Sequence, residues 1–125
     1  MERKSDFIAL VVDDSKLNRQ VLIEYLKNKD FKILEAEDGK EAISEIEKNV
    51  PDIILLDLIM PVMDGFETME YLKKNGNSIP IIVITAYMKE NTFNRCKELG
   101  AQGFINKPVK MHELFGTISK LIEQN

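Results

Sequence analysis

The sequence predicts a doubly wound α/β fold, in which a five-stranded parallel sheet is covered by five helices on its two faces. Two observations predict this class. Five short apolar runs alternate with segments whose apolar residues recur at the helical period. The runs themselves are almost continuously apolar, which indicates burial on both faces of a parallel sheet. With 125 residues the chain has the size of one domain, and we expect residues 1–125 to form it.

The first predicted strand is the apolar run at residues 8–12, and a helix follows it. Ser15 is a residue type that caps the N-terminus of a helix. The apolar positions of this helix are Leu17, Val21, Leu22, Tyr25 and Leu26. Residues 31–36 are a second strand, and their mixed polarity favours a place at the edge of the sheet.

A second helix follows the segment Asp38-Gly39-Lys40-Glu41, which has the pattern of a capping box. Its apolar positions are Ala42, Ile43 and Ile46. The third strand is predicted at residues 53–57, and a loop at residues 60–65 leads to a helix at residues 66–74.

The segment Asn75-Gly76-Asn77-Ser78 predicts a turn, after which residues 79–85 form the fourth strand. A helix follows at residues 88–99, and Gly100 ends it. The fifth strand is residues 103–106. The last helix has a clear 3.6-residue period at Met111, Leu114, Phe115, Ile118, Leu121 and Ile122.

Right-handed crossovers leave few possible strand orders. The order 2-1-3-4-5 is one of them, and it places strands 1 and 3 side by side where the direction of winding changes. Ligands of such sheets bind beyond the carboxyl ends of the strands at this point. We therefore expect the functional site there.

Composition excludes several classes of protein. The net charge of −4 argues against a nucleic-acid-binding surface. The single cysteine, Cys96, excludes an internal disulfide and suits a reducing compartment, so we expect a cytoplasmic protein. No apolar run approaches the roughly 20 residues of a membrane span. Residues 1–6 are not followed by the apolar stretch of a signal peptide.

Polar residues that could take part in binding or catalysis stand at the ends of four of the apolar runs. Asp13 and Asp14 follow the first strand, Asp57 closes the third, Thr85 ends the fourth and Lys107 follows the fifth. Because the carboxyl ends of parallel strands share one edge of the sheet, these side chains are expected to converge. One alternative stays open for the acid pair, which by itself is equally well explained as the cap of the first helix.

Three converging carboxylates need a cation. Two carboxylates about 4 Å apart repel by about 4 kcal/mol at an effective dielectric constant near 20. Oxygen-only ligands favour Mg²⁺, which keeps several waters and binds phosphates well. Lys107 precedes Pro108, which restricts its backbone and makes this peptide bond a candidate for the cis form. A lysine held in this way supplies a cation for phosphate oxygens.

A magnesium site with a further carboxylate, a hydroxyl and an ammonium group is suited to phosphoryl transfer. No serine or cysteine stands where it could be the nucleophile, so Asp57 is the natural acceptor and would form an acyl phosphate. Magnesium and Lys107 would neutralise charge on the transferred group.

The chain resembles the response-regulator receiver domain of two-component signalling over nearly its whole length, from Ile8 to Ile122. The combination of five motifs, in order and at these spacings, carries the resemblance. These motifs are Val11-Val12-Asp13-Asp14, Leu55-Leu56-Asp57-Leu58-Ile59-Met60-Pro61, Asp64-Gly65, Ile84-Thr85-Ala86 and Lys107-Pro108. The resemblance implies a flavodoxin-like receiver fold.

The resemblance also implies roles for individual residues. Asp57 would be the phosphoacceptor, and Mg²⁺ (or Mn²⁺ as a substitute) would be held by Asp13, Asp14, Asp57 and the backbone carbonyl of Ile59. Thr85 and Lys107 would be the switch hydroxyl and the phosphate-binding lysine, and Phe104 the switch aromatic.

The family's partners follow from the same resemblance. The phosphodonor would be a phosphohistidine on a histidine kinase or a histidine phosphotransfer domain. The output would pass through the face formed by helix four, strand five and helix five to a downstream protein. The resemblance implies a signalling switch that catalyses its own phosphorylation and dephosphorylation, rather than an enzyme acting on a separate substrate.

Two further positions predict how long the phosphorylated state lasts. Ile59 lies two residues after Asp57, and Tyr87 lies two residues after Thr85. Both positions flank the path of an attacking water, and bulky apolar side chains there would hinder hydrolysis. We therefore expect a long-lived acyl phosphate.

Three alternatives remain open. The chain is either a single-domain regulator or the receiver module of a hybrid histidine kinase or phosphorelay. A magnesium-dependent phosphohydrolase that forms an aspartyl phosphate is a remote alternative, since such enzymes usually carry Asp-x-Asp after the first strand, whereas Asp13 and Asp14 are adjacent. A receiver that binds partners without accepting phosphate is disfavoured because the key positions are intact.

Overall fold

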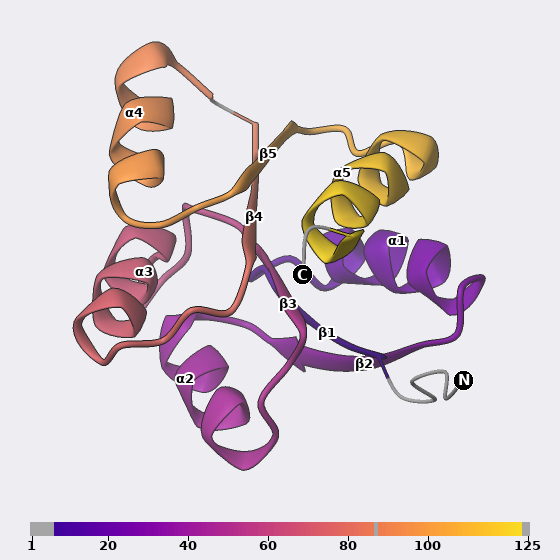
Figure 1. Ribbon diagram of the computed structural model, residues 1–125, viewed down its shortest axis with the longest axis horizontal. Coiled ribbons are helices and arrows are strands. Elements are labelled where there is room, and N and C mark those ends of the chain that lie inside the picture. Colours follow the sequence, from indigo (N-terminus) through magenta and orange to yellow (C-terminus); the bar gives the residue numbers. More distant parts are fainter. Residues whose placement is uncertain (1–6, 87, 124–125) are drawn as a thin grey trace.

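The computed structural model describes residues 7–86 and 88–123, in which strands and helices alternate along the chain (Figure 1). The strands are β1 (Phe7–Val12), β2 (Phe31–Ala36), β3 (Ile53–Leu56), β4 (Ile81–Thr85) and β5 (Gly103–Asn106). The helices are α1 (Lys16–Lys27), α2 (Gly39–Lys48), α3 (Gly65–Lys74), α4 (Glu90–Glu98) and α5 (Met111–Glu123).

The five strands form one parallel sheet in the order β2-β1-β3-β4-β5, which confirms the predicted topology and the edge position of β2. The register aligns Val12, the last residue of β1, with Leu56, the last residue of β3. The two strands therefore end level with each other, and the residues that follow them leave the sheet at the same place.

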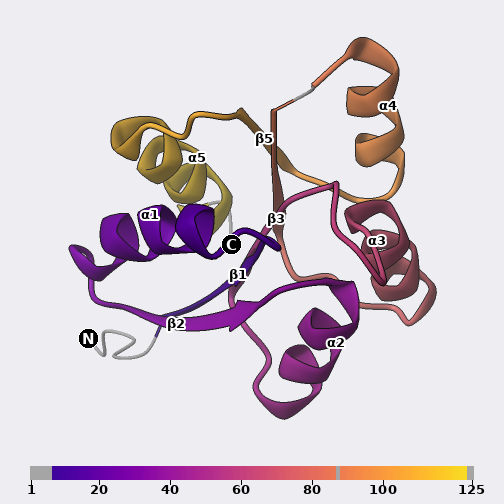
Figure 2. The same cartoon turned by 180° about the vertical axis from the view of Figure 1, so that it is seen from behind.

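Two helical layers cover the sheet, as the opposite views in Figures 1 and 2 show. Helices α1 and α5 pack on one face, whereas α2, α3 and α4 pack on the other. Strand β1 serves both layers, since Leu10 and Val12 belong to the core beneath α2–α4 and Ala9 and Val11 to the core beneath α1 and α5. This two-sided burial explains why the strands read as continuous apolar runs.

Local capping sets where several helices begin. The Ser15 hydroxyl accepts a hydrogen bond from the Asn18 amide at 3.2 Å and caps α1 as predicted. Helix α3 begins with a complete capping box between Asp64 and Glu67, with both bonds at 2.9 Å.

The capping box predicted for α2 is only half correct. The Asp38 carboxylate accepts from the Glu41 amide at 2.9 Å. The Glu41 side chain, however, accepts from the amide of Glu37 rather than from that of Asp38. The Glu41 carboxylate thus bonds to the amide of Glu37, the residue before the N-cap, and Asp38 still caps the N-terminus of α2.

Several predicted boundaries were wrong by one or two residues. Strand β4 begins at Ile81 rather than at residue 79, because Pro80 has no amide hydrogen to donate to the sheet. Helix α4 spans Glu90–Glu98 instead of residues 88–99, since Lys89 has extended backbone and is its N-cap. Strand β3 ends at Leu56, so Asp57 lies just beyond the sheet.

Helix α1 confirms only part of its predicted apolar face, since Leu22 and Leu26 are buried but two other predicted positions are not. Leu17 is 72% exposed and Val21 is 40% exposed. The buried positions are Arg19, Leu22 and Leu26, which share one face of the helix. An arginine therefore occupies a core-facing position next to the end of β1.

No helix in the described parts of the chain combines the length and apolarity needed to cross a bilayer.

Candidate functional site

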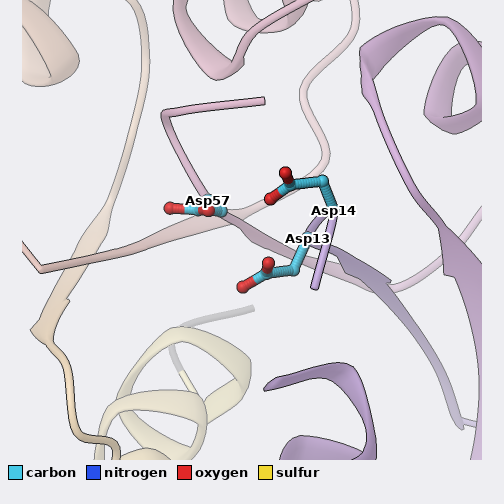
Figure 3. Close-up of side chains that lie close together, drawn as sticks. All are labelled: Asp13, Asp14 and Asp57. Carbon is cyan, nitrogen blue, oxygen red and sulfur yellow. The ribbon is translucent and has the colours of Figure 1, made fainter. Parts of the chain in front are cut away.

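The three predicted acidic residues meet beyond the carboxyl ends of β1 and β3. Asp13, Asp14 and Asp57 each contribute one carboxylate oxygen to a group whose atoms lie within 4.8 Å of one another. Figure 3 shows the three carboxylates directed into the same space. Asp13 and Asp57 are 3% and 7% exposed, whereas Asp14 is exposed to solvent. The predicted convergence of the acids is confirmed.

Lys107 reaches the same cluster from the loop after β5. Its ammonium nitrogen lies 2.9 Å from Asp13 Oδ2 and 3.5 Å from Asp57 Oδ2. The Lys107 amide also donates to the carbonyl of Thr85 at 2.9 Å, and the bond from Lys107 to Pro108 is cis. These contacts hold the lysine over the two buried carboxylates.

The charges in the cluster perturb one another. Burial raises the pKa of Asp57 above its ordinary value, and the negative charge of Asp13 raises it further, against the opposing effect of Lys107. Burial alone would lower the pKa of Lys107, but its hydrogen bond to Asp13 and the charges of both carboxylates outweigh burial and raise that pKa. Lys107 therefore remains a cation.

The backbone around Asp57 fixes one of its two carboxylate oxygens. Oδ1 accepts a hydrogen bond from the Leu58 amide at 2.8 Å, and Oδ2 is the oxygen that faces Lys107. The Gly65 amide donates to the Leu58 carbonyl at 2.9 Å. A Cβ atom on Gly65 would lie 2.5 Å from the carbonyl oxygen of Asp57, so this close approach requires glycine.

Thr85 and Phe104 lie where the sequence placed them, on neighbouring strands. Thr85 is the last residue of β4 and is 2% exposed. Phe104 on β5 is half-buried, and its ring lies 4.4 Å from that of Phe93 on α4, measured between ring centroids. The aromatic ring at the predicted switch position is thus packed against α4.

The loop after β3 carries exposed apolar side chains and one strained residue. Ile59, predicted to affect phosphate lifetime, is 66% exposed. Val62 has a φ of 68°, and the Met63 amide donates to the Pro61 carbonyl at 2.7 Å across it, which defines a γ-turn with positive φ. Tyr87, the second position predicted to affect the lifetime of the acyl phosphate, lies outside the described residues.

Sequence reasoning missed the contribution of Arg19. Its Nη1 donates to the backbone carbonyl of Asp13 at 2.8 Å, and its Nε lies 2.9 Å from a carboxylate oxygen of Glu35 on β2. A signal was available, because Arg19 stands three residues before Leu22 and seven before Leu26 on the buried face of α1. An arginine at core spacing indicates a buried, fully bonded guanidinium.

The donor set fits a small divalent cation such as Mg²⁺. All three ligands are carboxylate oxygens, which hard cations prefer. Three carboxylate oxygens within 4.8 Å of one another could hold one small cation between them, and Mg²⁺ commonly keeps several waters that can complete such a site.

A cavity of about 430 Å³ lies beside the cluster, between α1 and the loop after β5. Asp13 and Lys107 line one end of it. The rest of its lining is mainly apolar and comprises Asn18, Val21, Leu22, Tyr25, Ile84, Pro108 and Val109. The acidic cluster therefore borders an apolar recess on the outer surface.

The sequence matches known proteins across this whole arrangement. The family model described as "Response regulator receiver domain" matches residues 9–119. A cyclic di-GMP phosphodiesterase of Thermotoga maritima is 37% identical over 105 residues, which are 84% of this chain and 28% of that protein. The sensor histidine kinase RcsC of Escherichia coli is 33% identical over 95% of this chain and 12% of its own length. This chain therefore spans only a small part of these relatives.

Solved structures agree with the sequence comparison. A chain of the CheX-CheY-BeF3-Mg complex of Borrelia burgdorferi superposes with a TM-score of 0.86 at 30% identity, covering 93% of this chain and 89% of that one. Chemotaxis protein CheY4 of Vibrio cholerae gives a TM-score of 0.85 at 30% identity over 90% of this chain and 96% of its own. With the family match over residues 9–119 and the same parallel five-stranded fold, the chain belongs to the response regulator receiver domain family.

Proposed function

We propose that this receiver domain accepts a phosphoryl group from a phosphohistidine onto Asp57 in a magnesium-dependent reaction. The observation that supports this most strongly is the setting of Asp57. Its carboxylate is nearly buried, lies within 4.8 Å of two other carboxylates, and has one oxygen 3.5 Å from the Lys107 ammonium. A structural carboxylate would not require this concentration of charge at the end of a sheet.

The metal ligands of the proposal are Asp13, Asp14, Asp57 and the backbone carbonyl of Ile59. The fit of the three carboxylates supports Mg²⁺, with Mn²⁺ as a substitute of similar ligand preference. When bound, the cation neutralises negative charge on the acids and on the incoming phosphoryl oxygens. Without it, the carboxylates would repel an anionic donor.

The chain's own residues carry out the transfer. Oδ2 of Asp57 attacks the phosphorus, the bond from phosphorus to the donor histidine nitrogen breaks, and its electron pair stays on the imidazole ring, which then takes a proton. The Lys107 ammonium can bind an oxygen of the transferred phosphoryl group, because it already lies beside Oδ2 of Asp57. The Leu58 amide keeps Oδ1 in place during the attack.

The reverse loss of phosphate regenerates the free carboxylate. A water oxygen attacks the phosphorus, and the bond from phosphorus to the Asp57 oxygen breaks with its electron pair on the carboxylate. One proton of the water stays on the inorganic phosphate and the other passes to solvent. Ile59 lies two residues after the acceptor and its side chain is exposed, and we propose that it and Tyr87 obstruct the water. The chain would then act as a switch that catalyses its own phosphorylation and dephosphorylation.

The signal would leave through the face formed by α4, β5 and α5. Phosphorylation adds roughly two negative charges, which draw the Thr85 hydroxyl and let Phe104 change position. A shift from 1:99 to 99:1 requires about 5.5 kcal/mol of differential interaction. One charge-assisted hydrogen bond supplies about 1.5–3 kcal/mol, so Thr85 must act together with Lys107, the cation and backbone donors.

The proposed donor is a histidine kinase or a histidine phosphotransfer domain. Several relatives are hybrid or sensor histidine kinases, which supports a place in a hybrid kinase or phosphorelay. Response regulator MprA of Mycobacterium, 34% identical over 92% of this chain and 50% of its own length, equally supports a place in a response regulator. In either setting we propose a cytoplasmic location, to which the free thiol of Cys96 is suited, and an as yet unidentified downstream protein.

Intact-mass measurement after incubation with acetyl phosphate tests the proposal. We expect the wild type to gain the mass of one phosphoryl group when Mg²⁺ or Mn²⁺ is present. We expect no gain in mass when a chelator is added, and none in Asp57→Asn. Phosphorylation of Asp57→Asn to the wild-type level would contradict the assignment of the acceptor. Multiple turnovers of a stable phosphomonoester would instead support the phosphohydrolase alternative.

A further inference from the structure

Arg19 is a buried arginine that lies outside the acidic cluster but is bonded directly to it. Its side chain is 9% exposed and comes from the first turn of α1. Nη1 donates to the Asp13 carbonyl at 2.8 Å, and Nε lies 2.9 Å from Oε1 of Glu35 on β2. One planar guanidinium therefore joins the helix, the end of β1 and the edge strand.

Each polar group of Asp13 has a fixed partner. Its amide donates to the Ala36 carbonyl at 3.1 Å. Oδ1 accepts from the Ser15 amide at 2.9 Å, and Oδ2 accepts from Lys107 at 2.9 Å. Only the carbonyl depends on Arg19. That carbonyl belongs to the peptide unit between Asp13 and Asp14, so the bond from Arg19 fixes the plane from which both acids project.

We propose that Arg19, aligned by Glu35, is a positioning residue that preorganises Asp13 and Asp14 for a divalent cation. The inference rests on the metal site proposed above. The guanidinium suits this role because its donors lie in a rigid plane, whereas lysine offers a single flexible ammonium. Glu35 also neutralises a positive charge that would otherwise oppose a cation in the cluster.

The consequence concerns metal affinity rather than fold stability alone. Groups that orient metal ligands typically change metal affinity 10–100-fold when they are removed. Arg19→Lys keeps the charge but loses the two-directional bonding, so we expect Mg²⁺ to bind about 10-fold more weakly. Glu35→Gln keeps Arg19 but weakens its alignment and leaves its charge uncompensated, and both effects lower Mg²⁺ affinity.

Isothermal titration of the whole chain with MgCl₂, in the absence of any phosphodonor, measures this affinity directly. Urea unfolding of each variant reports its stability separately. Glu24→Gln is the matched control, because it makes the same charge change in the surface pair that Glu24 forms with Lys27 at 3.8 Å, on the same helix as Arg19. We expect Glu24→Gln to bind Mg²⁺ as the wild type does.

An unchanged Mg²⁺ dissociation constant in Arg19→Lys and Glu35→Gln would overturn the inference, and so would an equal loss in Glu24→Gln. If Arg19→Lys does not fold, Glu35→Gln still decides the question, since the Glu35 side chain is 48% exposed and tolerates substitution. A wild-type chain that bound no Mg²⁺ would remove the metal site itself and this inference with it. If the wild type binds Mg²⁺ and both variants bind it with the same affinity, the metal site stands and only the proposed role of Arg19 is wrong.

Discussion

Asp57→Asn is expected to make the cation-free chain more stable at neutral pH. Asp13 and Asp57 oxygens lie within 4.8 Å of each other, which gives a repulsion of at least about 3.5 kcal/mol at an effective dielectric constant of 20. Lys107 lies 3.5 Å from Asp57, which gives an attraction of about 4.7 kcal/mol on the same basis. Because these terms nearly cancel, the cost of removing the Asp57 carboxylate from water decides the sign.

Asparagine removes that cost while keeping an oxygen for the Leu58 amide. We expect a gain of about 1–2 kcal/mol in the free energy of unfolding, the usual size of a relieved unfavourable charge. The pH dependence gives an independent check. Since burial raises the folded-state pKa of Asp57 above 3.8, the folded chain binds a proton before the unfolded chain does as pH falls.

The penalty from Asp57 is therefore fully present above its folded-state pKa and disappears as pH falls through that value to 3.8. Urea unfolding followed by far-ultraviolet circular dichroism at several pH values measures both effects. Glu70→Gln, at an exposed position of α3, is the control and should change stability by less than about 0.5 kcal/mol. An Asp57→Asn variant no more stable than wild type at pH 7, or one whose advantage grew toward acid, would refute the reasoning.

Three further predictions concern the site. Val62→Asn should raise the free energy of unfolding by about 1 kcal/mol, because valine at positive φ is strained and its side chain is 77% exposed; equal stabilisation by Asn at exposed Val50 would point to another cause. Ile59→Asn and Tyr87→Glu should speed the decay of the phosphorylated mass, about fivefold for each kcal/mol removed from the barrier; unchanged decay would contradict steric protection. Thr85→Ala should still accept phosphate but lose about 1.5–3 kcal/mol of bias toward the active state. Its β5 amide NMR shifts on phosphorylation should shrink, and shifts of wild-type size would argue against Thr85 as the switch.

Strand order and the placement of the acids could be predicted because they depend on pattern and topology. Continuous apolar runs require two covered faces, and right-handed crossovers then limit the order of the strands. Once β1 and β3 are neighbours, Asp13 and Asp57 must leave the sheet together. Element boundaries were less accurate, as at β4, because local features such as Pro80 move them by a residue or two.

Other features of the site lie beyond what pattern alone reveals. The face that α1 turns to the core follows from its packing against the sheet, which exposes Leu17 and buries Arg19 despite their hydrophobicities. The reciprocal bond of the α2 cap depends on a rotamer of Glu41 that reaches Glu37 instead of Asp38. Neither choice is encoded by spacing, since each is decided by which partner lies within reach after folding.

By itself, the sequence determined the α/β class, limited the strand order to a few possibilities, and indicated the converging acids and the lysine that joins them, because periodicity and chain connectivity constrain these strongly. Only the tertiary structure decided which oxygen of Asp57 faces Lys107, that Val62 is strained, and that Arg19 holds the peptide between the two acids. These details depend on distances of a few ångströms between segments far apart in the chain, and such distances are set by the packing of the whole domain.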